Sequence, residues 1–202
     1  MSASAGRDTG TTAARASEWG VERLDVDAYL ERVGYDGDLK PTAETLRGLH
    51  RAHVAAIPFE NLDIVLGRGI SLEMDAMQDK LIRRHRGGYC YEHNLLFAAL
   101  LERIGFAVSR LTARIRMGSN EPQPSGHMLL RVDAGGRPWL ADVGFGGQRL
   151  LEPIPLEDGA TARQGSWTYR LDYEGAGVWV LRVWRPDGWF DLYGFTLEPR
   201  HH

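Results

Sequence analysis

Cys90 is the only cysteine in the 202-residue chain, and its surroundings are typical of a reactive thiol. The segment Arg86-Gly87-Gly88-Tyr89 precedes it and a long apolar run follows it, which predicts a sulfur at the N-terminus of a buried helix, reached through a glycine turn. A helix dipole stabilises an anion by only about 0.3–1 kcal/mol, so a strongly activated thiolate also needs a histidine partner. The alternative is that Cys90 is a small residue of the core.

His127 is the predicted base, and Asp142 the predicted group that orients it. If the turn between their strands is centred between Ala134 and Gly135, the pairing places His127 directly opposite Asp142. The carboxylate can then bind one imidazole nitrogen and leave the other free for Cys90, which is the arrangement of a nucleophilic triad. The alternatives are a structural His–Asp pair and a β-bulge that breaks the register.

The other histidines are weaker candidates for the base. His50 and His53 fall on one face of a predicted helix, and His85 lies among arginines, so these side chains are expected at the surface. His93 comes three residues after Cys90 on the same predicted helix. It can contact the thiol, but packing or hydrogen bonding is its expected role.

The predicted secondary structure that positions these residues changes from helices to strands near residue 107. Before it, apolar residues recur with a helical period over residues 24–33, 42–49, 74–81 and 90–104. After it the period is two, which predicts strands over residues 110–117, 127–132, 137–143, 167–173, 178–184 and 189–195. The expected fold class is α+β, with an N-terminal helical domain followed by an antiparallel β-barrel domain, or alternatively a sandwich.

These patterns divide the chain into three predicted segments. Residues 1–20, rich in Ser, Ala, Gly and Thr, are predicted to be a disordered tail. Residues 21–106 form the predicted helical domain that carries the nucleophile, and residues 107–202 the β-barrel domain that carries His127 and Asp142.

Composition narrows the class of protein. A content of 43% hydrophobic residues fits a folded domain, and a net charge of −3 without a basic block argues against nucleic acid as a partner. No apolar stretch approaches the roughly 20 residues that span a bilayer, so no membrane partner is expected. The first 18 residues lack the apolar segment of a secretory signal, and a single cysteine excludes a disulfide framework and a Cys-based zinc cluster. We therefore expect a cytoplasmic protein without a metal.

The residues around Cys90 resemble a known family. The segment Arg86-Gly87-Gly88-Tyr89-Cys90-Tyr91-Glu92-His93-Asn94 is similar to the R-G-G-x-C nucleophile motif of the arylamine N-acetyltransferases. Four further segments match in the family's order: residues 57–62, 125–128, 141–146 and 191–196. Matched position by position, the family's catalytic residues fall on Cys90, His127 and Asp142, and two aromatics that line its acceptor pocket fall on Phe59 and Phe145.

The resemblance also implies substrates and a mechanism. The family transfers an acetyl group from acetyl-coenzyme A, its donor and co-substrate, to an aromatic amine, a hydrazine or an N-hydroxyarylamine, through an acetyl-cysteine intermediate and within xenobiotic metabolism. Gly144 and Gly146, in the glycine-rich loop after Asp142, are the predicted cofactor-binding residues. The resemblance further implies a third, C-terminal α/β lid domain, which is largely missing here and whose absence puts the activity of this chain in question.

Two other functions remain compatible with the residues. Cysteine hydrolases of the papain or transglutaminase type use the same chain order of Cys, His and Asp or Asn, although the papain-type signature around the cysteine is missing. A catalytically silent binding fragment on the same scaffold is the other alternative.

Overall fold

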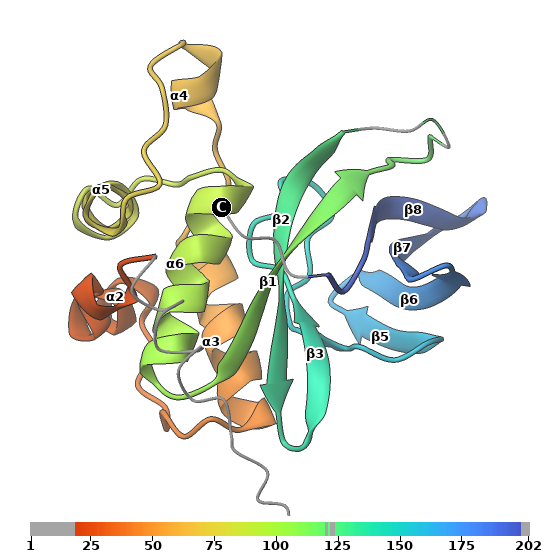
Figure 1. Cartoon of the computed structure of the whole chain (residues 1–202), viewed down its shortest axis with the longest axis horizontal. Helices are drawn as coiled ribbons and strands as arrows, with labels where there is room; N and C mark the ends of the chain where they lie inside the picture. Colours follow the sequence, from red (N-terminus) through yellow and green to blue (C-terminus); the bar gives the residue numbers. More distant parts are fainter. Residues whose placement is uncertain (1–18, 120, 122–123, 199–202) are drawn as a thin grey trace, which may run out of the picture.

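The chain begins with a group of helices and continues with a sheet (Figure 1). The structure is a computed structural model and describes residues 19–119, 121 and 124–198. The helices are η1 (Val21–Arg23), α2 (Val26–Val33), α3 (Ala43–Ala56), α4 (Leu62–Val65), α5 (Met74–Gln78), the π-helical turn η2 (Asp79–Arg83) and α6 (Cys90–Arg103). No helix in the described part of the chain combines the length and the apolar character needed to span a bilayer.

The predicted tail lies almost entirely outside the described residues. Trp19, which falls within its predicted bounds, packs against the helical core, and the guanidinium of Arg110 lies 4.9 Å from the centre of its ring. The predicted tail therefore extends too far at this end, because the tryptophan side chain has apolar surface to bury.

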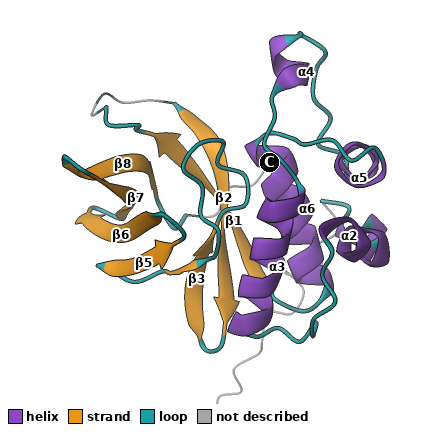
Figure 2. Ribbon diagram, turned by 180° about the vertical axis from the view of Figure 1, so that it is seen from behind, coloured by secondary structure: helices purple, strands orange, loops and turns teal. Residues whose placement is uncertain are grey.

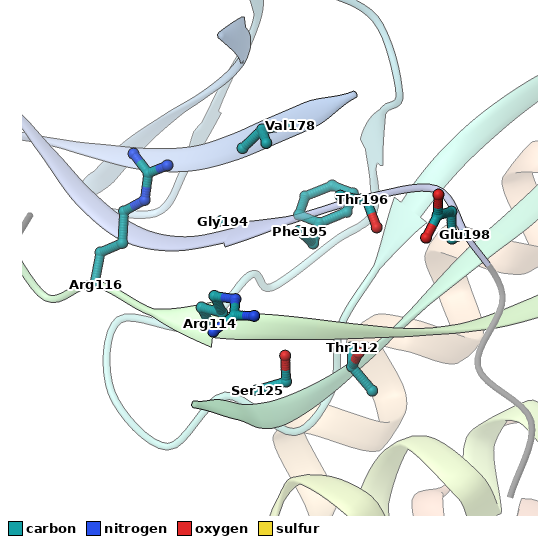
Figure 3. A pocket seen from close by; sticks show the side chains of 9 residues that line it. All are labelled: Thr112, Arg114, Arg116, Ser125, Val178, Gly194, Phe195, Thr196 and Glu198. Carbon is teal, nitrogen blue, oxygen red and sulfur yellow. The ribbon is translucent and has the colours of Figure 1, made fainter. Parts of the chain in front are cut away.

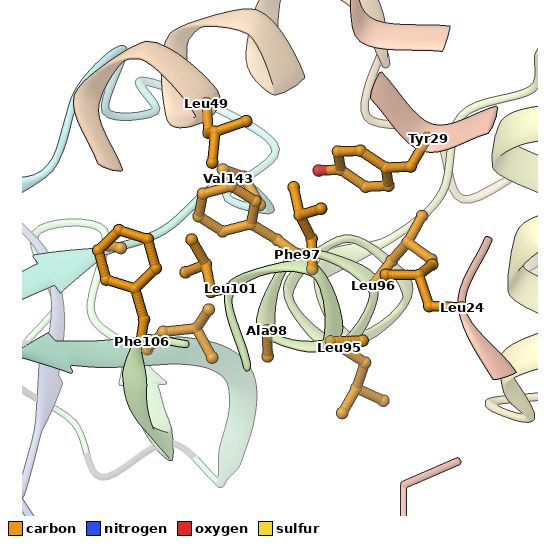
Figure 4. Close-up of a cluster of buried hydrophobic side chains, with 14 of the residues drawn as sticks. Leu24, Tyr29, Leu49, Leu95, Leu96, Phe97, Ala98, Leu101, Phe106 and Val143 are labelled. Atoms are coloured by element: carbon orange, nitrogen blue, oxygen red, sulfur yellow. The ribbon is translucent and has the colours of Figure 1, made fainter. Parts of the chain in front are cut away.

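Local capping signals define the first helices. The side chain of Asp25 accepts a hydrogen bond from the amide of Ala28 at the start of α2, and Thr42 caps α3 in the same way. Helix α6 has no exposed apolar face. Its residues Phe97 and Leu101 lie in the core together with Leu49 of α3 (Figure 4), as its continuous apolar sequence predicts.

The strands of the described residues form one antiparallel sheet in the order β4-β3-β2-β1-β8-β7-β6-β5. They are β1 (Ala107–Ile115), β2 (Ser125–Ala134), β3 (Arg137–Ala141), β4 (Ile154–Pro155), β5 (Ala160–Gln164), β6 (Trp167–Gly175), β7 (Val178–Arg185) and β8 (Gly188–Phe195). The edge strands β4 and β5 contact each other, so the sheet curls into a near-barrel beside the helices (Figure 2). The α+β fold class and the antiparallel near-barrel are confirmed.

Strands β4 and β5 were not predicted from the sequence. Strand β4 spans two residues, and β5 contains only alanine, threonine, arginine and glutamine, so neither carries a clear apolar alternation.

Strand β2 is buried on both faces and joins the two halves of the molecule. Met128 and Leu130 pack against the helices, whereas Leu129 belongs to the core inside the near-barrel. Helix α6 ends at Arg103 and β1 begins at Ala107, on either side of the predicted boundary. Because one strand serves both cores, the helices and the sheet form one packed unit at this boundary, and the division into separate domains stays a prediction.

The predicted register of the hairpin that carries His127 and Asp142 was wrong by two residues. Ala134 pairs with Arg137 and Leu130 with Ala141, so the turn consists of Gly135 and Gly136. Both glycines have positive φ angles, 60° and 76°, as a two-residue hairpin loop of the primed type requires. His127 is therefore not directly opposite Asp142.

Candidate active site

Cys90 is the first residue of α6, as the sequence predicted. Buried charged side chains hold the turn that precedes it. The carboxylate of Glu92 accepts a hydrogen bond of 3.0 Å from the amide of Tyr89. The Lys80 ammonium lies 2.9 Å from Glu92 and 2.9 Å from Asp63. Buried ions are stable only when they are paired in this way, so the pairing fixes the turn that leads to the cysteine.

The two glycines before Cys90 are required by close packing. A Cβ at Gly87 would lie 2.0 Å from the carbonyl oxygen of Pro58, and a Cβ at Gly88 would lie 2.9 Å from Oε2 of Glu92. The 58–60 segment and the turn also exchange backbone hydrogen bonds, including one of 2.8 Å from the amide of Glu60 to the oxygen of Gly88. A side chain at either glycine would displace the turn in front of the sulfur.

A β-bulge brings strand β2 to the sulfur. Ala113 pairs with His127 but Arg114 pairs with Ser125, so Gly126 is an extra residue on β2. The thiol of Cys90 donates to the Gly126 oxygen, with Sγ and oxygen 3.7 Å apart. Bulges of this kind re-aim side chains and backbone groups next to functional sites.

Asp142 lies one residue beyond the end of β3, and its carboxylate meets His127 diagonally across the hairpin. The Nε2 atom of His127 lies 2.7 Å from Oδ2 of Asp142, and the Tyr193 hydroxyl donates to the same oxygen at 2.8 Å. Oδ1 accepts from Nδ2 of Asn94 at 3.1 Å and from the amide of Gly144 at 3.0 Å. Each carboxylate oxygen is thus satisfied in a fully buried position.

His127 joins the carboxylate to the sulfur. The side chain of Cys90 also interacts with this ring and contributes to the raised pKa of His127. Because Asp142 occupies Nε2, Nδ1 is the ring nitrogen that remains for the sulfur. The residues predicted as nucleophile, base and orienting group are therefore brought together, because His127 is hydrogen-bonded to Asp142 and its ring interacts with Cys90.

The electrostatics of the pair favour a charged histidine. Burial lowers the pKa of His127, but the charge of Asp142, its hydrogen bond and the contact with Cys90 outweigh it and raise the pKa to about 9. Burial raises the pKa of Asp142, whereas the charge and hydrogen bond of His127, together with Asn94 and Gly144, bring it below the usual value. At neutral pH this is an imidazolium–carboxylate pair.

Of the two aromatic residues predicted to line an acceptor pocket, Phe145 packs against His127 and Phe59 packs against His93. The ring centre of Phe145 is 5.1 Å from that of His127 and 5.2 Å from that of Tyr193. The ring of Phe59 is parallel to His93, with centres 6.5 Å apart. Their role in binding an acceptor stays a prediction.

Gly144 and Gly146 have packing roles in the loop after Asp142. A Cβ at Gly146 would lie 2.6 Å from the ring of Phe59. A Cβ at Gly144 would lie 2.8 Å from Cα and from the carbonyl oxygen of Cys90. Close packing against Phe59 and Cys90 explains why both positions are glycine. Contact of either glycine with a cofactor stays a prediction.

Gly144→Ala should damage the site, because the added methyl meets backbone atoms of Cys90 that cannot rotate away. We expect a loss of about 1–3 kcal/mol in the free energy of unfolding, typical of overpacking, and slower alkylation of Cys90. Gly147→Ala is the matched control, since its Cβ meets nothing closer than an atom of Phe145 at 3.8 Å. Denaturant unfolding and thiol alkylation measure both variants. Equal behaviour of the two would contradict the packing role of Gly144.

The expectation that His50 and His53 lie at the surface was wrong, because both are completely buried. The hydroxyl of Tyr29 bonds Nδ1 of His53 at 2.5 Å, Nε2 of His53 bonds Nδ1 of His93 at 2.8 Å, and Nε2 of His93 bonds the Pro58 oxygen at 3.2 Å. Burial lowers the pKa of His93 to about 4. With both ring nitrogens engaged, His93 is a poor candidate for the base.

Sequence reasoning missed the polar residues that surround Asp142. Asn94 carries a usable signal, because it is the one uncharged amide in an apolar helix and lies four residues after Cys90, on the same face. Tyr193 lies within the matched segment 191–196, but nothing local to Tyr193 or to His50 indicates contact with Asp142.

A pocket of about 300 Å³ is lined by residues of β1, β2, β7 and β8 and of the segment that follows β8 (Figure 3). Its lining is Thr112, Arg114, Arg116, Ser125, Val178, Gly194, Phe195, Thr196 and Glu198. Neither Cys90 nor His127 lines it, but Ser125 is next to Gly126, whose carbonyl accepts the thiol. The pocket thus adjoins the site without containing the reacting groups.

Comparisons with known proteins agree with this geometry. A family model described as N-acetyltransferase matches residues 42–202. The chain is 44% identical to an arylamine N-acetyltransferase / N-hydroxyarylamine O-acetyltransferase of Salmonella typhimurium, over 84% of this chain and 60% of that protein. It is 43% identical to an arylamine N-acetyltransferase of Mycolicibacterium smegmatis, over 88% of this chain and 66% of that protein. The chain thus spans less than two thirds of the length of these relatives.

Solved structures extend the comparison to the fold. The arylamine N-acetyltransferase of Mycobacterium abscessus superposes with a TM-score of 0.85 at 44% identity, covering 91% of this chain and 67% of that one. That of Mycobacterium marinum, solved in complex with CoA, gives a TM-score of 0.83 at 39% identity, covering 88% and 67%. The resemblance seen in the sequence is confirmed, and the chain belongs to the arylamine N-acetyltransferase family.

Proposed function

We propose that this protein transfers an acetyl group from acetyl-coenzyme A to arylamines, arylhydrazines and N-hydroxyarylamines by a ping-pong mechanism. The observation that carries the proposal is the position of Cys90 beside the His127 ring, which is hydrogen-bonded to Asp142. The CoA complex of the M. marinum relative and the two activities in the name of the Salmonella relative support the donor and the acceptors.

In the first half-reaction, the sulfur of Cys90 attacks the thioester carbonyl. The imidazolium of His127 stabilises the thiolate by charge attraction, and Asp142 holds the ring in place. A bond forms between Sγ and the acetyl carbon while the bond from that carbon to the coenzyme A sulfur breaks. The departing thiolate takes the proton of His127, which leaves a neutral imidazole and an acetyl-cysteine.

In the second half-reaction, the amine nitrogen attacks the acetyl-cysteine. Nδ1 of His127 accepts the amine proton, the bond between carbon and Sγ breaks, and the imidazolium–thiolate pair returns. Phe59 and Phe145 are proposed to hold the aromatic ring of the acceptor, because Phe145 packs against the ring of His127 and Phe59 stacks on His93, which lies on the same helix as Cys90. The loop with Gly144 and Gly146 is proposed to lie against the coenzyme.

We propose that the protein is cytoplasmic, and the requirement for a free thiol supports this location. An isolated catalytic cysteine stays reduced in the cytoplasm, where a thiol-maintaining system operates. This agrees with a chain that carries Cys90 alone.

The consumption of acetyl-coenzyme A with and without an aromatic amine tests the proposal. Transfer predicts a burst of at most one coenzyme A per protein without amine, and continuous turnover with it. Continuous release of coenzyme A without amine would identify a hydrolase instead. Absence of both the burst and turnover in the folded protein would identify a silent fragment.

A further inference from the structure

The main chain at Asp142 is not paired with strand β2. The ladder between β2 and β3 ends with the pair of Leu130 and Ala141, so the amide of Asp142 has no strand to bond. It donates instead to Nε2 of His50, at 3.2 Å. His50 lies on α3, 92 residues earlier in the chain, and therefore takes the place of a strand at the point where the predicted orienting residue leaves the sheet.

The His50 ring has one consistent proton assignment. Since the amide of Asp142 can only donate, Nε2 must be the acceptor, and the proton lies on Nδ1. Nδ1 lies 3.1 Å from the carbonyl oxygen of Leu151 and donates to it. The ring is completely buried and lies edge-on to Phe97, with centres 5.8 Å apart and an interplanar angle of 88°. Both of its nitrogens are thus used to hold main chain.

The ring stays neutral under ordinary conditions. Burial lowers the pKa of His50 to about 4, against the opposing effects of Leu151, Asp142 and Glu152. A protonated ring would present a donor to the amide of Asp142 and break the contact. The bridge from α3 to Asp142 and Leu151 therefore persists throughout the neutral range.

We propose that His50 is a positioning residue that acts through Asp142 on His127. His50 holds the amide of Asp142, while Oδ1 of Asn94 accepts from the amide of Val143 at 3.2 Å. The two bonds fix consecutive peptide units from α3 and from α6. They place the Asp142 Cα so that its carboxylate reaches Nε2 of His127. The inference rests on the roles given above to Asp142 and His127.

A buried histidine on the same helix offers a matched control. His53 is equally buried on α3, and both of its nitrogens are also bonded, but to Tyr29 and His93 rather than to Asp142. His50→Leu and His53→Leu each remove a buried imidazole with two hydrogen bonds. Only the first removes contact with Asp142, so a purely structural role predicts the same outcome for both.

The titration of the His127 ring by NMR in the full chain is the test, because it needs no substrate. We expect His50→Leu to lower the pKa of His127 by about one unit or more, a tenfold loss of proton affinity, while His53→Leu leaves it unchanged. His50→Gln should restore the parental value, since its amide offers an acceptor oxygen for the Asp142 amide and an NH₂ donor for the Leu151 carbonyl. Alkylation of Cys90 at pH 7 should be slower in His50→Leu than in the unaltered protein, and unchanged in His53→Leu and in His50→Gln.

An unchanged His127 titration in folded His50→Leu, or an equal shift in His53→Leu, would overturn the inference. If His50→Leu does not fold, His50→Asn replaces it, because this side chain is polar but too short to reach both main-chain groups. In the unaltered protein, a scalar coupling between the Asp142 amide and Nε2 of His50 is expected, and its absence would also overturn the inference. Failure of the proposed function would appear separately, as a parent protein that takes up no acetyl group.

Discussion

Cys90→Ala should abolish the formation of the acetyl-enzyme. The unaltered protein, incubated with acetyl-coenzyme A without an amine, should gain the mass of one acetyl group, and the variant should gain none. The reason is that Cys90 carries the only thiol of the chain and that this side chain interacts with the ring of His127, which is hydrogen-bonded to Asp142. Intact-protein mass spectrometry measures the gain. An acetyl group that persists in the variant would place the nucleophile elsewhere.

The pH dependence of Cys90 alkylation is the companion measurement. The pKa of His127 is raised to about 9, so the imidazolium is present from pH 6 to 8 and is lost as the pH rises through about 9. We expect iodoacetamide to modify Cys90 readily at pH 6, where an unactivated thiol reacts slowly. In His127→Gln the reaction at pH 6 should become slow. Similar rates in the two proteins at pH 6 would contradict the pairing.

Asp142→Asn is expected to have the second large effect, on stability and on activity together. The amide cannot accept from all the donors that now surround the carboxylate, and it leaves the imidazolium of His127 buried without its counter-charge. Removing one partner of a buried pair costs about 3–5 kcal/mol in the free energy of unfolding. Loss of the orienting carboxylate in nucleophilic triads lowers turnover by about 10⁴-fold, and we expect a loss of that order.

Denaturant unfolding and single-turnover acetylation measure these effects, and the pKa of His127 should fall from its value of about 9 in the variant. Asp133→Asn is the control, because Asp133 lies on the same hairpin but is exposed and pairs with Arg131 at the surface. A change of similar size in both variants would show that the effect is not specific to the buried carboxylate.

The residues of the site could be named from the sequence, although the reasoning that paired two of them was imperfect. The predicted register was wrong by two residues, because the turn is formed by Gly135 and Gly136 rather than centred one position earlier. His127 and Asp142 nevertheless meet, since residues two apart on one face of a hairpin are diagonal neighbours within reach of long side chains. The family resemblance pointed to the same pair independently of the register.

The histidines show where sequence reasoning reaches its limit. His50 and His53 are polar residues on one helix face and flank Arg51 and Ala52, so the sequence predicts a solvated surface, although Leu49 directly precedes His50. The structure buries both, because the 143–153 loop and α2 bring a carbonyl and a hydroxyl to them from distant parts of the chain. A polar side chain enters a core when such partners exist, and the partners of His50 cannot be found by any local period.

The sequence by itself determined the change from helices to antiparallel strands near residue 107, the helix that begins at Cys90 and the identity of the candidate reactive groups, since these depend on apolar periods, glycine turns and rare residue types that are local in the chain. Only the tertiary structure decided which nitrogen of His127 meets Asp142, which donors surround that carboxylate and which histidine holds its main chain. Those contacts join α3, α6, β2 and β8, and the packing of the two cores on either side of β2 sets the distances between them.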